Sequence, residues 1–163
     1  LRFAALGPTD FFEHNRSHGI AVADFDGDGD LDVVVGHSRA RCGPPNDCYA
    51  TANVRYFENT AADGAPFLQL TLQGRGGSNR AAIGARVRVT VGDVTQTAEV
   101  GGGFGHYGAQ NDLTLHFGAG AFAAGCVAEV EVRWPDDALT VERLSVPTGG
   151  RYRMVQGEAP AAR

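Results

Sequence analysis

The segment from 24 to 32 constrains the fold of this chain more than any other, because it has an aspartate at every second position. It reads Asp-Phe-Asp-Gly-Asp-Gly-Asp-Leu-Asp. The whole chain has 19 acidic and 14 basic residues and a formal net charge of -5, so without these five aspartates the charges would balance. The acidity is therefore local. It favours a cation site and excludes a nucleic-acid surface, which would need a basic face.

Two apolar runs flank this segment, over residues 19–23 and 31–36. An apolar run on each side of a stretch rich in aspartate and glycine is typical of two strands joined by a turn. We therefore expect the segment to be the loop of a β-hairpin.

The spacing of the aspartates matches a calcium-binding loop, in which positions 1, 3, 5, 7 and 9 contribute ligands. These positions are held by Asp24, Asp26, Asp28, Asp30 and Asp32. Gly29 stands at position 6, where the loop turns sharply, and Val35 stands at position 12, where a helical hand has glutamate. Asp32 is therefore expected to supply the last carboxylate and Asp30 its backbone carbonyl. Oxygen ligands alone select a hard cation, so we predict Ca²⁺; a solvated polar turn is the alternative.

Alternation of apolar and polar residues with period 2 continues through most of the chain and predicts strands rather than helices. The expected strands are 67–73, 85–91, 94–100, 113–117, 127–134, 139–146 and 152–156. The fold class is therefore all-β, an antiparallel β-sandwich or barrel of seven or more strands with the calcium-loop hairpin added to it. The predicted division is 1–59 for an N-terminal strand and the hairpin, 60–66 for a linker, 67–157 for the β domain and 158–163 for a flexible tail.

The cysteines bear on the compartment. Cys42 and Cys48 bracket Gly-Pro-Pro-Asn-Asp, a turn-forming segment whose ends can meet, and we expect a disulfide between them; two unpaired thiols are the alternative. A disulfide implies an oxidising compartment. Cys126 is expected to be a small buried hydrophobic residue. Asn15 begins an Asn-Arg-Ser triplet, a possible glycosylation site, and no transmembrane run of about 20 apolar residues occurs.

The aspartate hairpin resembles an FG-GAP or VCBS repeat over about residues 15–59. That resemblance implies a calcium loop with the same five aspartates as ligands. Propellers built from such repeats have four to eight blades, and this chain has one candidate. A single hairpin cannot close such a ring, so its edges are expected to remain open to another chain.

The second half resembles the ASPIC/UnbV domain over about residues 66–157. Four blocks carry the resemblance: residues 78–87, 105–112, 115–118 and 130–135. In relatives this domain follows FG-GAP repeats in secreted proteins of the cartilage acidic protein type. The resemblance implies an extracellular or cell-surface, calcium-associated β module more than it implies a reaction.

The chain is not expected to be an enzyme. Glu129 and Glu131 alternate on one strand face as a solvated pair, and no serine lies in a G-x-S-x-G elbow. The histidines, including His37 and His116, show no metal-ligand spacing and are expected at the surface.

Two functional hypotheses follow. The first is a structural protein that forms a homo-oligomer or fibre, in which the N-terminal strand, with Leu1, Phe3 and Ala5 alternating, is donated to a neighbour's sheet. The second is a calcium-dependent adhesion module that binds a carbohydrate or protein. Its contact surface would be a glycine-rich loop containing His106, Tyr107 and Gln110, although these residues would equally serve to close hydrogen bonds within the fold.

Overall fold

The computed structural model describes residues 17–38, 53–60, 64–103, 109–120 and 124–163, and these form strands and turns without any helix. The prediction of an all-β fold is confirmed. Nothing in the described part is a helix with the length and apolar character of a membrane span. The strands are β1 Ser17–Ala23, β2 Asp32–His37, β3 Asn53–Phe57, β4 Phe67–Gln73, β5 Arg86–Val91, β6 Val94–Glu99, β7 Leu115–Gly118, β8 Val127–Arg133, β9 Val141–Pro147, β10 Gly150–Val155 and β11 Ala161–Ala162.

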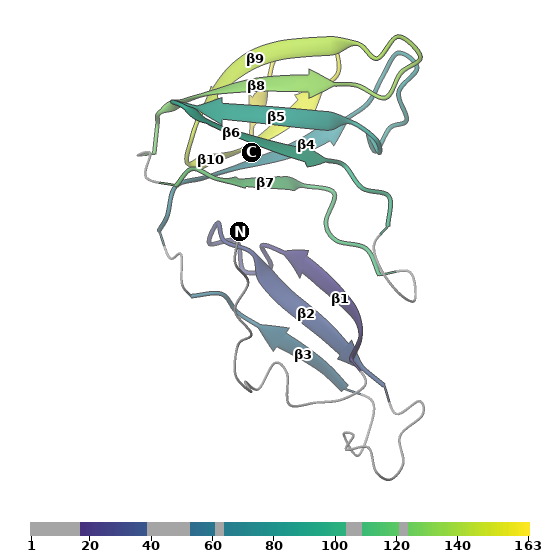
Figure 1. Cartoon of the computed structure of the whole chain (residues 1–163), viewed down its shortest axis with the longest axis vertical. Coiled ribbons are helices and arrows are strands. Elements are labelled where there is room, and N and C mark those ends of the chain that lie inside the picture. The colour runs from purple at the N-terminus through teal and green to yellow at the C-terminus, as the bar shows by residue number, and fades with distance from the viewer. Residues whose placement is uncertain (1–16, 39–52, 61–63, 104–108, 121–123) are drawn as a thin grey trace.

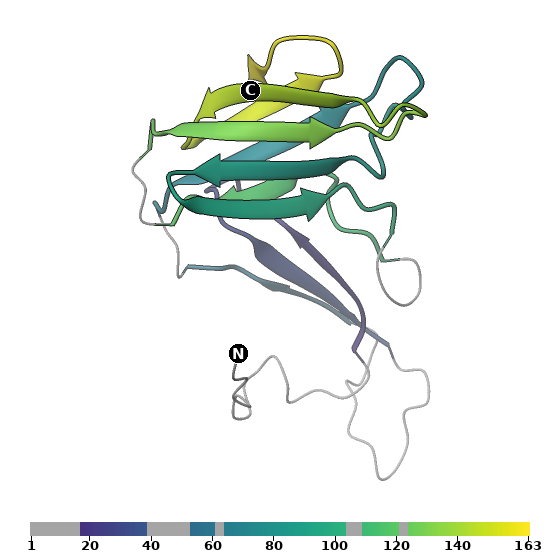
Figure 2. The ribbon, with the colours of Figure 1, turned by 45° about the horizontal axis from the view of Figure 1, so that its top comes forward.

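The strands form two units, seen one below the other in Figure 1. Strands β1, β2 and β3 make an antiparallel sheet, which we call the hairpin unit. Strands β4 to β11 make two four-stranded sheets with the orders β11-β10-β4-β7 and β6-β5-β8-β9, which together we call the β domain. Figure 2 shows these two sheets as layers, one in front of the other.

The core of the β domain lies between its two sheets and follows from the alternation in the sequence. In β5, Val87 and Val89 are buried while Arg86 and Arg88 are exposed, because neighbouring side chains of a strand point to opposite faces. Trp134 is fully buried in the same cluster. The facing sheet contributes the buried leucines Leu68, Leu70 and Leu72 of β4 and Met154 of β10.

Strand β10 runs parallel to β4, with pairs from Gly150 and Leu68 to Val155 and Gln73. This pair departs from the antiparallel expectation. The reason is topological: β9 belongs to one sheet and β10 to the other, so the chain crosses between layers at residues 148–149. Gly149 makes this crossing with a φ of +84° and donates its N–H to the Phe67 carbonyl.

Two strands were not expected from the sequence. Strand β3 pairs with β2 through Val34 and Tyr56, among others. Strand β11 pairs with β10 through Ala161 and Ala162, so the segment expected to be a flexible tail contains a short strand.

A candidate metal centre at the contact between the two units

The aspartate loop, residues 24–31, joins β1 to β2 directly after the last pair of the ladder, Ala23 with Asp32. The loop is folded by its own side chains. The N–H of Gly27 donates to Asp24 Oδ1 at 2.7 Å, that of Asp28 to Asp26 Oδ1 at 3.1 Å and that of Asp30 to Asp28 Oδ1 at 3.0 Å. Aspartate commonly caps the backbone a few residues ahead in this way. The loop of a β-hairpin is thus confirmed.

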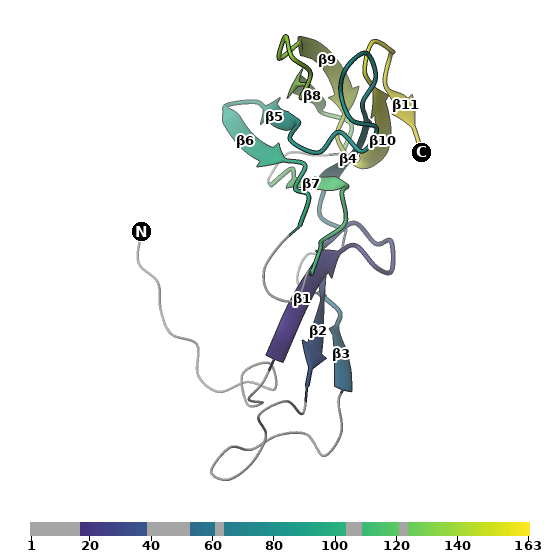
Figure 3. The ribbon, with the colours of Figure 1, turned by 90° about the vertical axis from the view of Figure 1, so that its right-hand side faces the viewer.

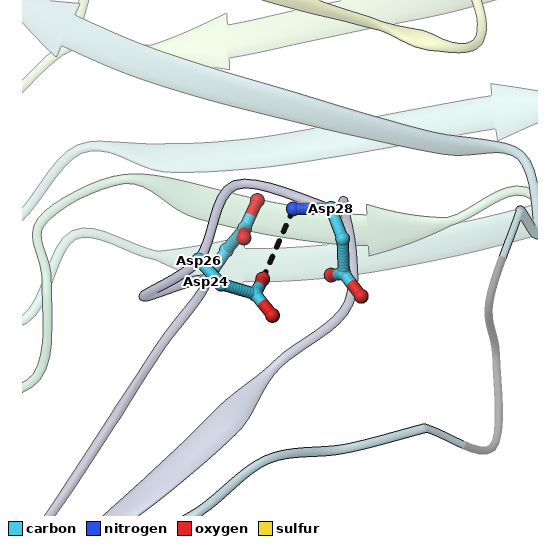
Figure 4. Close-up of side chains that lie close together, drawn as sticks. All are labelled: Asp24, Asp26 and Asp28. Carbon is cyan, nitrogen blue, oxygen red and sulfur yellow. Dashed lines mark hydrogen bonds between the residues drawn. The ribbon is translucent and has the colours of Figure 1, made fainter.

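Three of the five aspartates converge. Asp24, Asp26 and Asp28 each offer a carboxylate oxygen, and these oxygens lie within 4.8 Å of one another (Figure 4). Carboxylates held so close repel each other unless a cation offsets their charge. Because all the donors are hard oxygens, the set fits calcium and does not fit a soft thiophilic metal.

Asp32 has a structural task at the end of the loop. Its carboxylate is fully buried and accepts N–H bonds from Asn59 at 2.8 Å and from Phe25 at 3.0 Å. The Asn59 bond, with those from Phe25 and the Tyr56 hydroxyl, lowers the pKa of Asp32 despite burial. Burial of the Tyr56 hydroxyl and its bond to Asp32 raise the pKa of Tyr56 to about 12. Asp32 therefore fastens the loop to the end of β3.

Asp30 is also buried, at 7% exposed, but neither Asp30 nor Asp32 belongs to the three-residue cluster that the described residues form. Their roles as ligands remain predictions.

Asp24 connects the loop to the β domain. Its Oδ2 accepts bonds from Arg151 Nη2 of β10 at 2.8 Å and from Gln69 Nε2 of β4 at 2.7 Å. Burial opposes ionisation of Asp24, but the bonds from Arg151, Gln69, and the backbone of Gly27 and Gly29 together outweigh it, so its pKa is lowered. Arg151 therefore places a positive charge next to Asp24, the first predicted ligand of the calcium ion.

Further contacts seat the loop on the β domain. A Cβ added to Gly29 would lie 2.1 Å from Cε1 of Phe67, so the loop backbone lies directly against that ring. The N–H of Val22 donates to Asn111 Oδ1 at 3.0 Å. Figure 3 shows the loop end of β1 and β2 directed toward β4 and β7.

Two histidines lie elsewhere than expected. His116 is half-buried and stacks on Phe67 with ring centroids 6.0 Å apart, and burial lowers its pKa. His37 is 6% exposed. The expectation that both are surface residues was wrong: His116 lies where the two units meet, and His37 is buried at the other end of β2.

A cavity of about 200 Å³ lies where the units meet. Its lining includes Asp24 and Leu31 of the loop and Asn111, Asp112 and His116 of the β domain. Gln110, predicted at a ligand surface, is exposed next to this lining.

Several predicted residues lie outside the described part of the chain. They are His106, Tyr107, Cys42, Cys48, Asn15, Leu1, Phe3 and Ala5. Cys126 is described as a free, half-buried cysteine packed against the core.

Arg151 and Gln69 are the functional residues that the sequence did not indicate. Arg151 is 127 residues from Asp24, and no local pattern relates the two. Gln69 occupies a polar position of an alternating strand, which predicted solvent exposure, yet it is only 7% exposed because the loop covers it.

Comparison with known families confirms both resemblances. Residues 74–161, more than half of the chain, match the family model described as ASPIC and UnbV, and residues 18–50 match the FG-GAP repeat. No curated protein and no solved structure matches the chain. FG-GAP repeats generally bind calcium and typically occur in extracellular or cell-surface proteins.

Proposed function

The chain belongs to the ASPIC and UnbV family, and from this we propose that it is an extracellular, non-enzymatic structural protein that calcium stabilises and that assembles with copies of itself. The observation that carries the proposal is the convergence of Asp24, Asp26 and Asp28 within 4.8 Å in a loop that packs on the β domain.

Calcium would be held by these three aspartates, with Asp30 and Asp32 as further predicted ligands. The ion would supply positive charge to residues 24–32, whose five aspartates account for the entire formal net charge of the chain. Because the loop bonds to β4 and β10 through Asp24, an ordered loop supports the contact between the units as well as its own turn.

Calorimetric titration and thermal unfolding, each in calcium and in chelator, test the calcium site. A ligand at 100 times its dissociation constant stabilises the folded state by about 2.7 kcal/mol. We expect one ion to bind and the melting temperature to rise. The Asp26→Asn/Asp28→Asn double variant, in which both substituted residues are exposed, should lose this response. A wild-type protein with the same melting temperature in calcium and in chelator would refute the calcium site.

Self-assembly is supported by the edges of the hairpin unit. In the described part of that sheet, β1 and β3 are the outer strands. On β3, Val54 is 69% exposed and Tyr56 is 47% exposed. An edge strand with exposed apolar side chains is a template for pairing with another chain. A donated N-terminal strand would pair by main-chain hydrogen bonds, and a head-to-tail contact that does not close would give a filament.

Deleting residues 1–6 should leave monomers, as measured by analytical ultracentrifugation and electron microscopy with and without chelator. The matched control replaces these residues with a Gly-Ser segment of equal length, which removes Leu1, Phe3 and Ala5 but keeps the chain length. Assembly of either variant to the wild-type size would contradict strand donation.

A binding module is the second candidate, favoured by the cavity between the units. Its volume of about 200 Å³ is below the range of about 300 to 1000 Å³ that holds drug-sized ligands, so it suits one small polar group such as a sugar unit. Glycan-array binding that Tyr107→Ala abolishes, in a protein that stays monomeric, would favour this function over assembly.

A further inference from the structure

Arg151 contacts the aspartate loop at two points. Its Nη2 donates to Asp24 Oδ2 at 2.8 Å and to the carbonyl of Gly27 at 2.7 Å. These residues hold loop positions 1 and 4, so one guanidinium fixes both the first predicted ligand and the backbone that follows it. Asp24 is almost covered, with 6% of its side chain exposed.

The guanidinium is held in place from the β domain. Arg151 Nε donates to Gln69 Oε1 at 3.0 Å, while Gln69 Nε2 donates to Asp24 Oδ2. The ring of Phe67 lies beneath the guanidinium, 5.0 Å from its carbon to the ring centroid. A planar guanidinium fixed by a stacking ring and a second hydrogen bond loses little freedom when it binds a carboxylate.

We propose that Arg151 is a positioning residue for the calcium loop and couples ion binding to the docking of the hairpin unit on the β domain. The proposal rests on the calcium site proposed above. Arg151 and Gln69 orient the Asp24 carboxylate through Oδ2, while Oδ1 faces the loop and accepts the N–H of Gly27. Removing an outer partner of a metal ligand typically weakens metal binding about 10- to 100-fold.

Two effects of Arg151 on the ion oppose each other. Its positive charge repels a cation, so removing it would tighten binding, whereas its hydrogen bonds orient the loop, so removing it would weaken binding. The Arg153→Gln and Arg151→Lys variants together separate them. Arg153 lies two positions along the same strand, is exposed and bonds to Gln73 instead of the loop. Arg153→Gln removes the same net charge from the same strand and leaves the bonds to Asp24 intact, whereas Arg151→Lys keeps a positive charge at residue 151 itself.

Coupling between sites is reciprocal, so any factor by which docking strengthens ion binding is also the factor by which the ion strengthens docking. The chain has a natural reporter of this second effect. Its single tryptophan, Trp134, is buried in the core of the β domain, in a different unit from the aspartate cluster.

The test titrates calcium into the wild type and the Arg151→Gln, Arg151→Lys and Arg153→Gln variants by calorimetry, with thermal unfolding followed at Trp134. We expect Arg151→Gln to bind calcium about 10-fold more weakly than Arg153→Gln. We also expect calcium to raise the melting temperature followed at Trp134 by less in Arg151→Gln than in Arg153→Gln. Arg151→Lys keeps the positive charge but loses the planar set of guanidinium donors, so we expect its calcium affinity to lie between those of the wild type and Arg151→Gln. If Arg151→Gln does not fold, Arg151→Lys is compared with Arg153→Gln in its place.

The two proposals fail differently. A wild type that binds no calcium overturns the calcium site itself. A wild type that binds calcium, with Arg151→Gln binding it as tightly as Arg153→Gln, overturns only the coupling role of Arg151.

Discussion

Replacing Asp24 with alanine should destabilise the protein even when no calcium is present, because this side chain joins the two units. Its Oδ2 accepts bonds from Arg151 and Gln69, and its Oδ1 accepts the N–H of Gly27. The comparison is Asp28→Ala, which removes the same charge from the same loop. Asp28 is exposed, and its Oδ1 accepts the N–H of Asp30 within the loop itself.

The expected loss follows from these contacts. Arg151 has 38% of its side chain exposed, so its pair with Asp24 is worth about 1 kcal/mol after screening by solvent. Gln69 is 7% exposed, and its Nε2 would keep only the 3.5 Å contact with His116, so leaving it unsatisfied costs about 1–3 kcal/mol. Together the free energy of unfolding should fall by about 2–4 kcal/mol for Asp24→Ala, and by about 1 kcal/mol for Asp28→Ala.

Scanning calorimetry in excess chelator measures both variants. A change of 1 kcal/mol shifts the melting temperature of a domain of this size by about 2–4 °C. The Asp24→Ala shift should therefore exceed the Asp28→Ala shift by several degrees. Equal shifts would refute the reasoning, since they would mean that Asp24 matters only as one more charge in the loop.

Three further predictions address the fold. Gly29→Ala should destabilise by about 1–3 kcal/mol in chemical denaturation, because the residue has a φ of +102° and the new Cβ would meet Phe67; a neutral effect would mean that the loop does not rest on that ring. Leu70→Ala, at a fully buried site, should cost about 2–5 kcal/mol by the same measurement, and a loss below 1 kcal/mol would contradict its place in the core. Hydrogen bonds from the Thr140 N–H, the Thr140 side chain and Gln156 lower the pKa of Asp136, so the stability that Asp136 adds is present above its ordinary pKa and is lost as pH falls through the lowered value. Asp136→Asn should therefore reduce the fall of the urea unfolding midpoint at acid pH. A midpoint that depends on pH as in the wild type would contradict this role.

The strand pattern and the aspartate cluster could be predicted from the sequence because both are local. Strand β4 spans Phe67–Gln73, as its alternation predicts, and one inward-facing set of residues is enough to define it. The converging carboxylates follow from their spacing in one short loop, which folds on its own side chains.

What could not be predicted depends on pairing between distant segments. Nothing near Arg151 indicates that it reaches Asp24, because the parallel placement of β10 beside β4 brings them together. Strand β3 was not predicted, because the apolar residues of an alternating strand are usually the buried ones, whereas Val54 and Tyr56 of β3 are exposed. The same exposed residues are what the assembly proposal uses.

Hydrogen exchange measured in calcium and in chelator tests the central claim most directly, namely that the aspartate loop binds calcium and thereby fastens the hairpin unit to the β domain. We predict that calcium slows exchange in residues 24–32 and also in β4 and β10, which supply Gln69 and Arg151. Unchanged exchange throughout, or slowing confined to the loop, would contradict it.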